Sequence, residues 1–106
     1  MLERRSEPRV RNTLRVQISG IDACCEEFSE NALAVNLSRA GAFVCGVHAG
    51  LRCGDFITVR YGENIAHFRI IWVLESGIGG SAVAIHRVQH ERCPWEEVLH
   101  EETVGH

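Results

Sequence analysis

Short segments of alternating apolar and polar residues fill most of the chain from Arg15 onward. In residues 15–21, Val16 and Ile18 share one face, which is typical of a half-buried strand. Five further segments rich in β-forming residues lie at 31–38, 42–46, 55–61, 64–75 and 81–88. Turn-forming residues separate them, as in the Gly62-Glu63-Asn64 sequence, which is a plausible hairpin turn. The pattern predicts an all-β sandwich or barrel.

The segment 31–38 (NALAVNLS) divides its side chains between two faces. Leu33, Val35 and Leu37 share one face, and Leu37 is expected to point into the core. Asn36 and Ser38 share the opposite face with two alanines, so we expect this polar pair side by side on the outer surface. Gly41 follows shortly and allows a turn with positive φ.

The last segment has a helical pattern. Pro94 suits the first position of a helix, and two glutamates after it suit the positive end of the helix dipole. Trp95, Val98 and Leu99 share one face. We expect a short helix at about 94–102, packed on the β domain. The chain then divides into a basic arm at 1–13, a β-barrel at 14–90 and a helical segment at 93–103.

The length of 106 residues predicts one compact domain. The formal net charge of −3 argues against a nucleic-acid polymer or an anionic membrane as partner. All eleven basic residues are arginine, and five of them lie among the first fifteen residues. Arginine suits forked recognition of phosphates or base edges, although a genome-level bias against lysine explains the composition equally well.

Composition and motifs also predict where the protein acts and what it does not do. We expect a cytoplasmic protein, because no secretion signal or membrane-spanning run is evident. Five cysteines without a CxxC pair are expected to be reduced. His86, His90 and Cys93 resemble a zinc spacing but lack an obvious fourth ligand. We therefore expect no metal site, no enzyme cofactor and no catalysis.

Two short motifs contain the candidate binding residues. In RRSEPR at 4–9, Pro8 disfavours a helix, so Arg5 and Arg9 are expected on an extended or turned arm. In NLSRAG at 36–41, an amide and a hydroxyl lie close to an arginine. Arginine binds the O6 and N7 edge of guanine in bidentate fashion, and an amide can bind the remaining edge. The set suits a guanine ligand.

Both motifs resemble those of the PilZ domain family of bacterial cyclic di-GMP receptors. RSEPR at 5–9 matches the family's RxxxR pattern, and NLSRAG at 36–41 matches its (D/N)xSxxG pattern. FRIIWV at 68–73 resembles the strand that follows in the family, and Cys93-Pro94-Trp95 resembles the start of its final helix. The resemblance implies a six-stranded antiparallel β-barrel with a short C-terminal helix and a flexible basic N-terminal arm. The ligand would lie on the outer barrel surface under that arm.

The resemblance also implies a role for each motif residue. Arg5 and Arg9 would grip the guanine edges and the phosphates, and Gly41 would shape the loop. Asn36 and Ser38 would contact a guanine from the barrel side.

Three positions outside the two core patterns are also informative. Family members with an arginine at the position of Arg4 tend to bind an intercalated pair of ligand molecules. Trp72 matches a position whose aromatic ring faces the ligand in some members, although a strand tryptophan is more often part of a core. Ala84 stands where the family commonly has glycine, which is a departure from the family at the floor of the site.

The sequence therefore favours a non-enzymatic receptor that binds cyclic di-GMP and relays it by conformational change to an unidentified protein partner. One alternative is a PilZ-like protein-interaction module that does not bind nucleotide. Another is a small RNA-binding barrel, which the net charge and the absence of aromatic residues in the arm disfavour.

Overall fold

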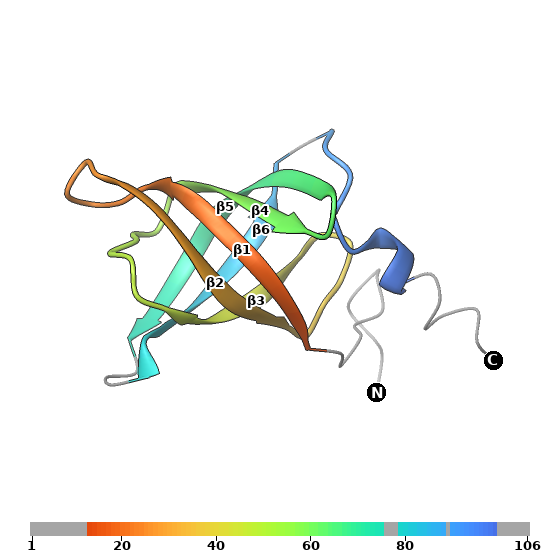
Figure 1. Ribbon diagram of the computed structural model, residues 1–106, viewed down its shortest axis with the longest axis horizontal. Coiled ribbons are helices and arrows are strands. Elements are labelled where there is room, and N and C mark those ends of the chain that lie inside the picture. Colours follow the sequence, from red (N-terminus) through yellow and green to blue (C-terminus); the bar gives the residue numbers. More distant parts are fainter. Residues whose placement is uncertain (1–12, 76–78, 89, 100–106) are drawn as a thin grey trace, which may run out of the picture.

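The computed structural model describes residues 13–75, 79–88 and 90–99. Within those ranges the chain forms six antiparallel strands that close into a barrel in the order β1-β2-β3-β6-β5-β4 (Figure 1). The strands are β1 (Leu14–Ile21), β2 (Glu27–Val35), β3 (Gly41–Val47), β4 (Phe56–Tyr61), β5 (Asn64–Glu75) and β6 (Ser81–Arg87). The predicted fold class is confirmed. The described part of the C-terminal segment is helical at 96–99.

The core fills the inside of the barrel with the inward-facing residues of each strand. Val16 and Ile18 of β1 are buried, as their alternation predicted. Phe68 and Ile70 of β5 are fully buried in the same core, and the C-terminal segment adds Trp95. Burying such apolar side chains supplies the main favourable contribution to folding.

The assignment of faces in β2 was wrong. Ala32 and Ala34 point into the core, whereas Leu33 is 44% exposed. The strand ends at Val35, and Asn36 has a left-handed backbone with φ 56°. That residue interrupts the two-residue alternation, so Leu37 is fully buried although strand parity would turn it outward. Asparagine is among the few residues that adopt this conformation readily.

Turns and a bulge set the outer surface of β5. Tyr61 pairs with Asn64 across a two-residue loop in which Gly62 has φ 63°, which confirms the predicted hairpin turn. Further along β5 the pairing with β6 shifts between Ile70 and Trp72. A β-bulge of this kind inserts one extra residue, here Ile71, and leaves both Ile71 and Trp72 exposed.

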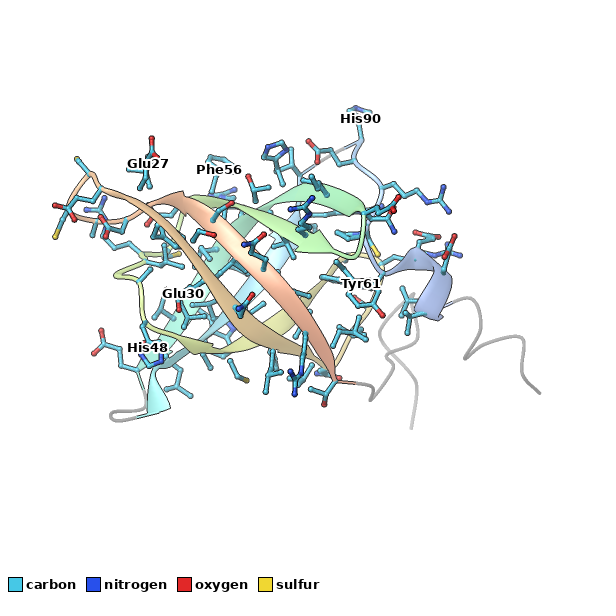
Figure 2. All side chains as sticks on the ribbon, viewed as in Figure 1. Glu27, Glu30, His48, Phe56, Tyr61 and His90 are labelled. Carbon is cyan, nitrogen blue, oxygen red and sulfur yellow. The ribbon has the colours of Figure 1, made fainter. Side chains whose placement is uncertain are left out.

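The connection between β2 and β3, the β4–β5 turn and the C-terminal helical residues gather at one end of the barrel (Figure 1). The β1–β2 and β3–β4 connections lie at the opposite end, where the backbone nitrogen of His48 donates to the Glu30 carboxylate at 2.8 Å (Figure 2). Among the described residues, no helix is long and apolar enough to cross a membrane.

Candidate functional site

The loop 36–41, which contains the NLSRAG motif, is closed by bonds between Ser38 and Gly41. The backbone nitrogen of Ser38 donates to the Gly41 oxygen at 2.9 Å. The Ser38 hydroxyl accepts from the Gly41 nitrogen at 3.3 Å and donates to the Gly41 oxygen at 3.4 Å. Ser38 is only 4% exposed, so the prediction that it lies beside Asn36 on the outer surface was wrong. Its hydroxyl fixes the shape of the loop.

Gly41 is required for a different reason from the one predicted. Its φ lies outside the left-handed region, so no positive-φ turn explains it. Gly41 instead begins β3 opposite His86 of β6, and a Cβ added there would lie 1.9 Å from the backbone oxygen of Ile85. Only glycine allows the two strands to approach so closely.

The C-terminal segment, described at residues 90–99, contacts the motif loop through two side chains. The Trp95 indole Nε1 donates to the backbone oxygen of Ser38 at 2.8 Å, and Glu96 forms an ion pair with Arg39 at 3.3 Å. From β6, the backbone nitrogen of Arg87 donates to the Ala40 oxygen at 2.7 Å. The sequence pattern placed Trp95 on an apolar helix face but gave no sign of its bond to the loop. The loop is therefore anchored by β6 and by the C-terminal segment.

The anchoring segment is itself fixed to β5 through Glu91. Its Oε1 accepts from the His67 backbone nitrogen at 2.7 Å, and its Oε2 lies 3.0 Å from His67 Nδ1. The backbone and side-chain hydrogen bonds from His67 lower the pKa of Glu91 below its ordinary value. Nearby, burial raises the pKa of the Cys93 thiol to about 11.

An aromatic pair lies on the outer face next to the loop. Phe43, two residues after Gly41, pairs across the strands with Ala84, and Ala84 pairs with Trp72. The Phe43 and Trp72 rings meet above Ala84, with their centroids 5.4 Å apart and an angle of 58° between planes. Trp72 is 41% exposed, so it belongs to the outer surface and not to the core. Ala84 is buried beneath the two rings.

Phe43 was missed by the sequence analysis. Its position between the inward-facing Ala42 and Val44 is the signal that could have placed it on the outer face. The structure thus brings the motif loop and Trp72 together through Phe43. Arg4, Arg5 and Arg9 lie outside the described residues.

Comparison with known proteins supports the fold. A scan against protein-family models and a search of curated proteins found no match. Among solved structures, the chain is similar to the inhibitor of motility MotI/DgrA of Bacillus subtilis, with a TM-score of 0.66 and 13% sequence identity. The similarity covers 98% of this chain and 53% of the other, so the chain spans about half the length of that protein. The chain therefore shares the fold of the matched part of that structure.

Proposed function

We propose that this protein is a non-enzymatic receptor that binds cyclic di-GMP between its N-terminal arginines and the outer surface of the barrel. The observation that carries the proposal is the hydrogen-bonded motif loop 36–41 beside the aromatic pair of Phe43 and the exposed Trp72. A planar base needs an aromatic face to stack on and fixed polar groups at its edge. The PilZ-like fold and the RxxxR pattern of residues 5–9 agree with this ligand.

Each arm residue has a proposed task. Arg5 and Arg9 bind guanine O6 and N7 or the phosphates, since a guanidinium matches either in bidentate fashion. Arg4 supplies a further cation for a second, intercalated ligand molecule, because stacking two dianions concentrates negative charge.

The barrel residues have complementary tasks. Trp72 stacks on a base, and the amide of Asn36 bonds to a guanine edge. Ser38 and Gly41 act by fixing the loop that presents Asn36, because the Ser38 hydroxyl is buried against Gly41.

Ligand binding would alter the surface offered to a downstream protein partner. Cyclic di-GMP bridges the arm and the barrel, which holds the arm over the loop 36–41. The loop is hydrogen-bonded to Trp95 of the C-terminal segment, so a movement of the loop would also displace that segment. The relay is a change in which surfaces are presented, without chemistry on the ligand.

Calorimetric titration with cyclic di-GMP tests the proposal. Wild type should bind saturably, and Arg5→Ala should bind at least about fivefold more weakly, because one bidentate guanine contact contributes about 1–3 kcal/mol. Arg52→Ala is the matched control, since Arg52 is exposed in the β3–β4 connection at the opposite end of the barrel. Absence of binding by wild type, or equal binding by Arg5→Ala, overturns the proposal. One ligand per protomer would refute the proposed role of Arg4.

A PilZ-like protein-interaction module without nucleotide is the second candidate. The exposed apolar side chains of Leu33, Trp72 and Leu74 on the outer surface favour it, because such surfaces also serve protein contacts. A protein partner that protects residues 1–13 from proteolysis, with no calorimetric signal for cyclic di-GMP, would support this candidate over the first.

A further inference from the structure

A hollow lies on the outer face of β4, β5 and β6, and the aromatic pair of Phe43 and Trp72 is not part of its lining. It has a volume of about 410 Å³ and is lined by Phe56, Arg69, Ile71, His86, Arg87 and Val88. Figure 2 shows Phe56 at the upper margin of the barrel, away from the C-terminal helical residues. The hollow is thus built from strand residues that neither motif contains.

Three side chains form a straight row across this hollow. Arg69 pairs with Phe56 across β4 and β5 and with His86 across β5 and β6. Neighbouring strands lie about 4.8 Å apart, so the row spans about 10 Å. The row places an aromatic ring at one end, a guanidinium in the middle and an imidazole at the other end.

The guanidinium at the centre of the row suits an anion. Among the described residues, no carboxylate pairs with Arg69, because Asp55 pairs with Arg52 and Glu91 pairs with His67. His86 Nδ1 lies 3.0 Å from the Arg87 oxygen, and a carbonyl oxygen only accepts, so Nδ1 carries a proton. With its proton on Nδ1, the neutral His86 ring presents Nε2 as an acceptor, so the donors to an anion come from Arg69. Arg69 can donate two parallel hydrogen bonds to a phosphate or carboxylate.

The walls of the hollow are apolar and exposed. Phe56 is 60% exposed, and the β5 bulge turns Ile71 outward so that it is 46% exposed. Exposed apolar side chains that flank a cation are typical of sites for ligands with an apolar body and one charged group.

We propose that this hollow binds an organic anion in which a phosphate or carboxylate is joined to a planar ring. The anionic group lies on Arg69, and the ring lies on Phe56. The ligand is either a separate aromatic anion or a further part of a nucleotide bound at the motif loop, because His86 pairs directly with Gly41. The proposal does not rest on binding of cyclic di-GMP.

An NMR titration of the full chain with phenyl phosphate tests this site. Saturable shifts are expected at the amides of Phe56, Arg69 and His86. Arg69→Gln should weaken binding at least about tenfold, as expected for loss of a hydrogen-bonded charge. Arg60→Gln is the matched control, because Arg60 is an exposed arginine of β4 outside the hollow. Shifts elsewhere in the protein, or equal affinity in Arg69→Gln, overturn the proposal.

Two further measurements test the ring contact separately from the anion contact and show whether the ligand is a separate anion or part of the nucleotide. Phe56→Ala should weaken phenyl phosphate but leave the affinity for inorganic phosphate unchanged; equal effects on both would refute a ring contact. Cyclic di-GMP added to the phenyl phosphate complex either displaces it, which identifies the hollow as part of the nucleotide site, or binds beside it, which identifies a separate anion. Failure of cyclic di-GMP to bind affects only the function proposed above.

Discussion

The indole nitrogen of Trp95 donates a 2.8 Å hydrogen bond to the backbone oxygen of Ser38, which lies 57 positions earlier in the chain. Trp95 is fully buried and stacks on Phe68 of β5, with ring centroids 5.3 Å apart. The tryptophan therefore connects the core, the C-terminal segment and the motif loop in one side chain. A buried donor paired in this way specifies one position for the loop.

Replacing Trp95 with phenylalanine tests this connection. Trp95→Phe keeps an aromatic ring against Phe68 but removes the donor to Ser38, which leaves a buried oxygen without that bond. We expect the free energy of unfolding to fall by about 1–3 kcal/mol, measured by urea denaturation, and cyclic di-GMP to bind more weakly. Trp72→Phe is the control, because Trp72 is exposed and its replacement should change stability by less than about 0.5 kcal/mol. Equal stabilities for the two variants would contradict the argument.

Gly41→Ala should be strongly destabilising. The new Cβ would lie 1.9 Å from the Ile85 oxygen, which belongs to the backbone of β6 and moves only with its strand. Overpacking of this kind costs about 3 kcal/mol or more, and thermal unfolding would measure it. Gly79→Ala introduces the same methyl group where, among the described residues other than its chain neighbours, no atom lies within 4 Å, so its melting temperature should match wild type. A normal melting temperature for Gly41→Ala would show that β3 and β6 can separate without cost.

Strand positions could be predicted from the sequence because alternation is a local property. The segment 64–75 coincides with β5, and Val16 and Ile18 are buried in β1 as expected. The face of β2 could not be predicted, because the left-handed residue Asn36 breaks the alternation just before Leu37. A single backbone conformation thus exchanged the inner and outer faces assigned to that strand.

The candidate site was predictable as a motif but not as a geometry. The pattern at 36–41 identified the loop, yet the burial of Ser38 and the need for Gly41 depend on β6 and Trp95, which are distant in sequence. The contact of Trp72 with Phe43 likewise depends on the β5 bulge and on strand order. Contacts of this kind require the closed barrel and leave no trace in local periodicity.

Trp72→Ala should separate binding from stability. If a guanine base stacks on Trp72, the variant should bind cyclic di-GMP at least about fivefold more weakly, since stacking on an aromatic side chain contributes about 1–3 kcal/mol per base. Calorimetry measures this loss. Ile65→Ala on the same strand is the control, because Ile65 is also exposed, at 55%, but is not part of the aromatic pair. An unchanged affinity for Trp72→Ala would remove this residue from the proposed site.

Glu91 should make stability depend on acid pH. Its pKa is lowered in the folded state by the hydrogen bonds from His67, so the ionised carboxylate stabilises the fold. This contribution is present above the ordinary glutamate pKa of about 4.3 and is lost as pH falls through the lowered value. Melting temperatures between pH 7 and the acid range should decline less in Glu91→Gln than in wild type. Glu63→Gln, in the exposed β4–β5 turn, should follow the wild-type curve.

Cys93 should resist alkylation while the fold is intact. The thiolate is the reactive form, and burial raises the pKa of Cys93 to about 11, so little thiolate exists near neutral pH. Cys24 is exposed in the β1–β2 turn and serves as the internal control. Iodoacetamide under native conditions should label Cys24 first, and peptide mass spectrometry should detect Cys93 labelling only after urea is added.

Because Cys93 lies two residues before Trp95, loosening of the C-terminal segment in Trp95→Phe should also raise Cys93 labelling. Native labelling of Cys93 as fast as that of Cys24 would show that this segment opens freely, and the link from the motif loop to the C-terminal segment would then lose its physical basis.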